Sequence, residues 1–121
     1  MITMTPSILI VDDHPSFRRF ATKLLEAGGF EVVGEAGDGE RALALALRLR
    51  PQVVLLDVVL PDRSGFEIAE ALAGEARDVV LVSSRSATEL SDGIERSPAR
   101  GFITKSELTA AGVTALLAGE R

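Results

Sequence analysis

Three segments of this chain are apolar at every residue, and this pattern constrains the fold more than any other feature of the sequence. They are Ile8–Val11, Val53–Leu56 and Val79–Val82. A strand that packs on one face alternates apolar and polar residues, whereas a strand covered on both faces is apolar throughout, as in parallel sheets. The chain is therefore expected to contain a parallel sheet buried between two layers of helices.

Two weaker strands are predicted at residues 30–36 and 101–104. Glu31 and Glu35 indicate that the first of these lies at an edge of the sheet, because charged side chains are tolerated there. Helical patterns separate all five strands. The resulting order, a strand and then a helix repeated five times, predicts an α/β sandwich with right-handed crossovers.

Helix starts are predicted from capping signals. Pro15 fits the first turn of a helix that ends at the paired glycines 28–29, and Asp38 can cap a second helix that stops before residue 51. Ser64 and Ser86 each precede a glutamate by three residues, which is the spacing of a capping box. Ser106 is expected to cap a last helix that runs from about residue 107 to residue 118.

Composition narrows the class of protein. The 121 residues suit one domain, with residues 1–6 as a loose tail before a domain at 7–121. The absence of cysteine excludes disulfides and thiolate metal sites. No apolar run approaches the roughly 18 residues of a membrane helix, and no basic region precedes the first apolar segment. The net charge of −5 argues against direct nucleic-acid binding. We therefore expect a cytoplasmic protein.

Polar residues gather at the predicted carboxyl ends of the strands, where open α/β sheets bind ligands. They are Asp12, Asp13, Asp57 and Ser83, with Lys105 after the last strand. Two carboxylates at about 4 Å repel each other by about 4 kcal/mol at an effective dielectric constant near 20, and a divalent cation would offset this. Oxygen ligands favour Mg²⁺ or Mn²⁺. With a lysine and a hydroxyl, such a site can bind a phosphoryl group.

Each of these residues also has a simpler interpretation. The acidic pair 12–13 can be a helix cap beside a solvated acid, and Asp57 can be a strand-end carboxylate bonded to backbone amides. Ser83 taken alone is an ordinary strand-end hydroxyl, and Lys105 alone an ordinary surface lysine. The joint pattern favours a site, because each residue follows a different strand at the same edge of the sheet.

The sequence resembles the receiver domain of two-component response regulators, in the style of receivers that belong to LuxR-type regulators. The resemblance covers residues 7 to about 118, and four segments carry it: ILIVDDHPSFRR, VVLLDVVLPDRSGFE, VVLVSS and ARGFITKSEL. It implies a flavodoxin-like (βα)5 three-layer sandwich with the parallel sheet in the order 2-1-3-4-5. It also implies a phosphoacceptor that catalyses its own phosphorylation and dephosphorylation and is not otherwise an enzyme.

The resemblance assigns roles to the site. Asp57 would accept a phosphoryl group from a sensor histidine kinase or a phosphotransfer protein. Mg²⁺ (or Mn²⁺) would be held by Asp57, the acidic pair and the Val59 carbonyl, and Lys105 and Ser83 would contact the phosphoryl oxygens. Movement of Ser83 and Phe102 would then change the surface of the fourth helix, fifth strand and fifth helix, to which a downstream protein partner would bind.

The sequence departs from the family pattern at several places. Ser83 and Phe102 stand where threonine and tyrosine are frequent, and Ser106 stands where a cis proline is frequent, so the isomer of that peptide bond stays open. In the family, the positions of Val59 and Arg85 tune loss of the phosphoryl group. The apolar Val59 predicts slow autodephosphorylation, although ordinary loop packing explains it equally well.

Two further features have alternative interpretations. His14, the single histidine, can be a metal ligand or phosphoryl carrier, but a residue at a helix start is favoured. Residues 108–118 carry no charge, which fits a helix with one core face and a neutral outer face, or a homodimer surface.

Three rival functions fit the sequence less well. A haloacid-dehalogenase-like phosphatase would place a second acid at Val59, and a dinucleotide-binding domain would need a glycine-rich turn after its first strand. A pseudo-receiver scaffold that is never phosphorylated is disfavoured by the complete set of site residues. The chain is expected to be a stand-alone receiver, with the receiver fragment of a longer DNA-binding regulator as the alternative.

Overall fold

The computed structural model describes residues 5–73 and 77–119. The five strands are β1 (Ser7–Val11), β2 (Glu31–Ala36), β3 (Val53–Asp57), β4 (Asp78–Ser83) and β5 (Gly101–Thr104). The helices are α1 (Pro15–Ala27), α2 (Gly39–Leu49), α3 (Gly65–Ala73), α4 (Ser91–Arg96) and α5 (Ala110–Leu117), with a 3-10 turn at Lys105–Glu107. None of the helices in the described ranges is long and apolar enough to cross a membrane.

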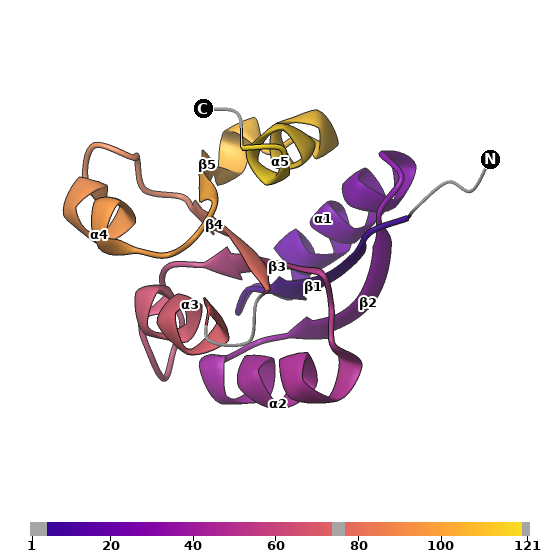
Figure 1. Cartoon of the computed structure of the whole chain (residues 1–121), viewed down its shortest axis with the longest axis horizontal. Helices are drawn as coiled ribbons and strands as arrows, with labels where there is room; N and C mark the ends of the chain where they lie inside the picture. The colour runs from indigo at the N-terminus through magenta and orange to yellow at the C-terminus, as the bar shows by residue number, and fades with distance from the viewer. Residues whose placement is uncertain (1–4, 74–76, 120–121) are drawn as a thin grey trace.

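The strands form one parallel sheet in the order β2-β1-β3-β4-β5, which confirms the predicted fold (Figure 1). β2 lies at one edge, as expected from Glu31 and Glu35. The wholly apolar runs belong to β1, β3 and β4, and the central strands β1 and β3 are fully covered except at Ser7. All five strands therefore point their carboxyl ends toward one edge of the sheet.

Helices cover both faces of the sheet. Figure 1 shows α1 and α5 on one side and α2 and α3 on the other. The first layer packs through Ala21 and Leu25 of α1 and Val113 of α5, and the second through Ile68 and Leu72 of α3 together with the two buried alanines of α2. Alternate residues of each central strand enter the two cores, so an unbroken apolar run is what this position requires.

The predicted starts of the first two helices are confirmed. His14 is the N-cap of α1, and its side chain makes no capping hydrogen bond. Asp38 caps α2 by accepting a hydrogen bond from the Arg41 amide at 2.7 Å. Gly28 ends α1, and a Cβ there would overlap Ala110, so α1 and α5 approach closely at this point.

The start of α4 differs from the prediction. The capping box forms, since the Ser86 hydroxyl accepts from the Glu89 amide at 3.2 Å and the Glu89 carboxylate accepts from the Ser86 amide at 3.5 Å. The residues that follow form turns, however, and the regular helix begins only at Ser91. α4 has no buried residue, so little packing energy holds this first turn in helical geometry.

The prediction for the start of the last helix was wrong. Ser106 does not cap it, because residues 105–107 form a separate 3-10 turn. Leu108 is buried and its backbone is extended, which interrupts the helical path. Thr109 is the true N-cap and accepts from the Gly112 amide at 2.9 Å. No cis peptide bond occurs in the described part of the chain, so Ser106 follows Lys105 through a trans bond.

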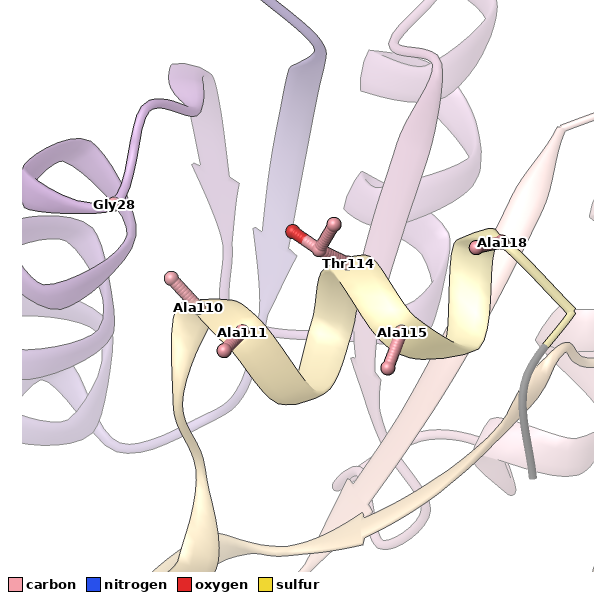
Figure 2. Close-up of a pocket in the computed structure, with 6 residues that line it drawn as sticks. All are labelled: Gly28, Ala110, Ala111, Thr114, Ala115 and Ala118. Carbon is pink, nitrogen blue, oxygen red and sulfur yellow. The ribbon is translucent and has the colours of Figure 1, made fainter.

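The outer surface of α5 is made of small side chains. A hollow of about 440 Å³ lies beside the end of α1. Figure 2 shows the residues that line it, Gly28, Ala110, Ala111, Thr114, Ala115 and Ala118. Val113 is the single buried residue of this helix. The helix thus has one core face and an uncharged outer face, and both sequence interpretations of residues 108–118 agree with that arrangement.

Candidate functional site

Three neighbouring strands end in the same local geometry. Asp12 follows β1, Asp57 ends β3 and Ser83 ends β4, and all three are buried. Each side-chain oxygen accepts a hydrogen bond from the amide two residues later, at 2.8 Å for Asp12, 3.1 Å for Asp57 and 3.1 Å for Ser83. These local bonds fix the side-chain directions and turn the chain out of each strand. The sequence-predicted residues therefore meet at one edge of the sheet.

Lys105 joins the two buried carboxylates. Its ammonium lies 2.5 Å from Asp12 Oδ2 and 3.2 Å from Asp57 Oδ2. The same ammonium lies 4.6 Å from the centre of the Phe17 ring, so the charged end of the side chain also contacts α1. The lysine arrives from the 3-10 turn after β5, on the far side of β4. The ammonium therefore supplies a positive charge to the two carboxylates that burial would otherwise leave uncompensated.

Burial and the hydrogen-bonded neighbours of Asp57 shift its pKa in opposite directions. Burial raises the pKa of Asp57 from 3.8 to about 6, although the Val59 amide and the Lys105 charge lower it, and the nearby Asp12 charge raises it further. Burial lowers the pKa of Lys105, but the contact with Asp12 and the charge of Asp57 outweigh this and hold it above its ordinary value. At neutral pH the site therefore contains an ionised Asp57 beside a charged lysine.

Gly65 allows α3 to start directly against the end of β3. Its amide donates to the Val58 carbonyl at 2.7 Å. A Cβ at this position would overlap the Asp57 carbonyl oxygen and lie 2.7 Å from Val58 Cα. Because both obstacles are backbone atoms, they cannot move aside as a flexible side chain would. The glycine in the segment that follows Asp57 is thus a steric requirement of the site.

The acidic cluster is suited to a divalent cation. One ligand atom from each of Asp12, Asp13, His14 and Asp57 lies within 4.8 Å of the others. The site fits a metal because it brings three carboxylates together, and the Lys105 ammonium, which lies against Asp12 Oδ2, offsets only part of their negative charge. Asp13 is partly exposed, so a cation can enter from solvent. Carboxylates are the ligands that Mg²⁺ and Mn²⁺ prefer.

The loop after β3 connects the site to α2. Val59 donates its amide to Asp57, and its own side chain is 52% exposed beside the site. Asp62 accepts from the Gly39 amide at 2.8 Å and from the Glu40 amide at 3.0 Å. These bonds lower the pKa of Asp62. No role was predicted for Asp62 from the sequence, because its partners are more than twenty residues away.

Arg18 is a second residue for which the sequence predicted no role at the site. Its guanidinium donates to the Asp12 carbonyl at 2.7 Å and to Glu35 of β2 at 2.9 Å. It therefore fixes the backbone from which the acidic pair projects. Its position on the polar side of α1 gave no sign of this role in the sequence.

The remaining predicted residues lie around this cluster. Arg85 is exposed, and its backbone amide donates to the Ser83 hydroxyl. Phe102 pairs with Leu81 in the sheet and is half-buried. It lines a hollow of about 560 Å³ between α4 and α5, which also includes Ile94 and Leu116. Phe102 thus borders this hollow at the surface between α4 and α5.

Comparison with protein families gives a match over most of the chain. The family model of the response regulator receiver domain matches residues 8–116. The nitrate/nitrite response regulator protein NarP of Escherichia coli is 39% identical over an alignment of 102 residues, which covers 81% of this chain and 47% of NarP. The transcriptional regulatory protein PdtaR of Mycobacterium tuberculosis is 31% identical over 99 residues, which are 81% of this chain and 48% of PdtaR. The chain spans about half the length of these relatives.

Solved structures give the same result. A LuxR-family two-component response regulator from Aurantimonas has a TM-score of 0.86 at 29% identity, covering 98% of this chain and 89% of that one. The signal receiver domain of NarL from Mycobacterium tuberculosis has a TM-score of 0.81 at 29% identity, covering 95% and 98%. The resemblance noted in the sequence therefore extends to the arrangement of all five strands and helices.

Proposed function

The chain belongs to the response regulator receiver family, whose domains pair with histidine kinases, and from this premise we propose that Asp57 is a phosphoacceptor. The phosphoryl group would come from the phosphohistidine of a sensor histidine kinase or a phosphotransfer protein. The observation that supports this most is the position of Asp57: it is a buried carboxylate held by the Val59 amide and the Lys105 ammonium.

In the proposed transfer, a carboxylate oxygen of Asp57 attacks phosphorus. An O–P bond forms, the N–P bond of the phosphohistidine breaks, and the electron pair returns to the imidazole nitrogen, which then takes up a proton. Lys105 and Ser83 would donate hydrogen bonds to the phosphoryl oxygens. Transfer of this kind depends on the position of the reacting groups and on neutralisation of the charge on the phosphoryl group. The Lys105 ammonium, held between Asp12 and Asp57, would provide a fixed positive charge for this.

Mg²⁺ or Mn²⁺ is the proposed cofactor, held by Asp12, Asp13, Asp57 and the Val59 carbonyl. Such a cation supplies positive charge that neutralises the transferring group. The chain's own residues prepare the site for it. The Asx turns of Asp12 and Asp57 fix the carboxylates, and Arg18 anchors the backbone of the acidic pair.

Phosphorylation would be transmitted to the surface by Ser83 and Phe102. The phosphoryl group adds about 1.5 to 2 negative charges, which favours movement of the Ser83 hydroxyl toward it. Thr104, which pairs with Ser83, lies two residues from Phe102 on the same strand. Rotation of Phe102 into the core would then reshape the α4–β5–α5 surface, to which a downstream protein would bind.

We further propose the extent and setting of the domain. Residues 7–121 would form the receiver and residues 1–6 its tail, of which residues 1–4 lie outside the described residues. The protein would act through protein contacts, without membrane or direct nucleic-acid binding, and would catalyse no reaction beyond its own phosphorylation and dephosphorylation. A stand-alone receiver, the receiver of a longer DNA-binding regulator, and a homodimer through the uncharged face of α5 all agree with this assignment.

Incubation with acetyl phosphate and Mg²⁺ tests the proposal. Intact-mass spectrometry should show one added phosphoryl group on the wild type, none on Asp57→Asn, and one on the control Asp62→Asn, which changes another acid of the same loop. Chelation of the metal should abolish the addition. A wild type that remains unmodified while folded would identify a pseudo-receiver scaffold and refute the assignment.

A further inference from the structure

The ring of His14 lies between the two carboxylates of the acidic pair. His14 Nδ1 is 3.1 Å from Asp12 Oδ1 and 3.1 Å from Asp13 Oδ1. The sequence pattern favoured a simple helix start for this residue. It does occupy the N-cap of α1, but its side chain makes no capping bond, and Nδ1 is instead hydrogen-bonded to Asp12 Oδ1, which directs the ring at the acidic pair.

These distances match those between ligands of one metal ion. Two ligand atoms about 2.1 Å from a metal and at right angles to each other are about 3 Å apart. The imidazole nitrogen stands at this separation from both carboxylates, and all the ligand atoms of the cluster lie within 4.8 Å of one another. A cation held by the acidic pair would replace the contacts of Nδ1 with the two carboxylates, and the electron pair of that nitrogen would then be available to the ion.

The two oxygens of Asp12 face different partners. Oδ2 meets the Lys105 ammonium inside the protein, whereas Oδ1 faces His14 and accepts its amide hydrogen bond at 2.8 Å. A cation therefore approaches on the Oδ1 side, which His14 borders. The His14 and Asp13 side chains are 67% and 37% exposed, so the ion can reach them from solvent.

We propose that His14 adds an imidazole nitrogen to the metal site and so raises the affinity of this receiver for first-row transition cations such as Co²⁺ and Zn²⁺ relative to its affinity for Mg²⁺. Imidazole is a good ligand for these ions and a poor one for Mg²⁺, which prefers oxygen. The inference rests on the same metal site as the proposed function. It deepens that function, because a competing cation would control when the site is available for Mg²⁺-dependent phosphorylation.

The single histidine makes a direct test possible. Co²⁺ is added to the tag-free protein, and proton NMR is used to look for a strongly shifted resonance from the carbon-bound Cδ2–H of a coordinated imidazole, which does not exchange with solvent. Any such signal belongs to His14, and it needs no variant to assign it. The wild type should show one signal of this kind, and its absence with bound Co²⁺ would overturn the proposal.

Calorimetry with Co²⁺ and Mg²⁺ gives the second measurement. In His14→Ala the ratio of Co²⁺ to Mg²⁺ affinity should fall about tenfold or more, since one nitrogen ligand is lost. An unchanged ratio, or Co²⁺ binding that strengthens, would show that the ring only neutralises the carboxylates in the absence of metal, and would refute the inference. Asp57 phosphorylation is measured separately. A Co²⁺–His14 signal without phosphorylation would contradict only the proposed function, and phosphorylation without a Co²⁺–His14 signal would contradict only this inference.

Discussion

Lys105 and Asp57 are separated by 48 residues in the chain, yet the ammonium donates a hydrogen bond to the carboxylate at 3.2 Å. The contact crosses β4, the strand between them, so it forms only when β3, β4 and β5 lie in their final order. The central electrostatic contact of the site is therefore a product of the complete sheet. A change that loosens β5 should affect the site even if no site residue is altered.

The raised pKa of Asp57 predicts how stability depends on pH. The carboxyl has a pKa of about 6 in the folded protein and 3.8 when it is free of the fold, so between these values the folded protein holds more protons than the unfolded chain. The free energy of unfolding therefore falls as pH rises through this window, by about 2 to 3 kcal/mol from this group. Asp57→Asn has no such group and should escape that loss.

Urea titrations of both proteins with a chelator present measure this effect. The stability of Asp57→Asn relative to the wild type should increase by about 2 to 3 kcal/mol between about pH 4 and pH 7.5. A difference that stays constant with pH would show that burial of Asp57 is not destabilising.

Gly65 should tolerate no side chain. Gly65→Ala places a methyl group against the Asp57 carbonyl oxygen and Val58 Cα, and should lower the free energy of unfolding by about 3 kcal/mol. Gly37→Ala is the matched control, because its methyl group would meet only Arg18 Nη1, at an ordinary contact distance of 3.4 Å. Its effect should stay within about 0.5 kcal/mol. Denaturant unfolding of the two variants measures these changes. Equal losses of unfolding free energy would contradict this explanation of Gly65.

Most of the fold could be predicted because a parallel strand that is buried on both faces is apolar at every residue. The sheet, its edge strand and the first two helices follow from apolar runs, Glu31 and the Asp38 cap. The start of α5 could not be predicted in this way. Ser106 and Thr109 are both plausible caps, and burial of Leu108, a tertiary effect, decides between them.

The site was partly predictable for the same reason. Strand ends place Asp12, Asp57 and Ser83 together in any sheet of this order. The roles of Arg18 and Asp62 depend on partners in other elements, and no local pattern indicates them. The environment of His14 required the actual direction of its ring.

Val59 should control the lifetime of the phosphorylated state. Its exposed side chain stands beside Asp57 and has no group that can orient an attacking water. Val59→Asn adds such a group, and one hydrogen bond worth about 1.4 kcal/mol in the transition state would speed hydrolysis about tenfold. The decay of phosphorylated protein after removal of acetyl phosphate measures this. Equal or slower decay in the variant would favour the packing interpretation of Val59.

Arg100 should stabilise the end of α5. Its guanidinium donates to the Leu117 carbonyl at 2.6 Å, a group that the helix end leaves free, and to the Leu116 carbonyl at 3.4 Å, which also accepts from the Gly119 amide. Arg100→Ala should cost about 1 kcal/mol. Arg19→Ala, an exposed change on α1, is the control and should cost less than about 0.5 kcal/mol. Thermal melts compare them, and equal stability of both variants would mean that this cap contributes nothing.

The bonds from Asp62 to the start of α2 have a practical consequence. The Gly39 and Glu40 amides report on a loop whose first residues touch Asp57, yet they lie on a different helix and far from any metal ligand in sequence. In an NMR spectrum of the backbone amides, these two signals would respond to rearrangement of the loop. Gly39 and Glu40 do not bind the ligand themselves, so the response would not come from direct contact with it. The two amide signals can therefore serve as reporters of site occupancy in real time, without an attached probe.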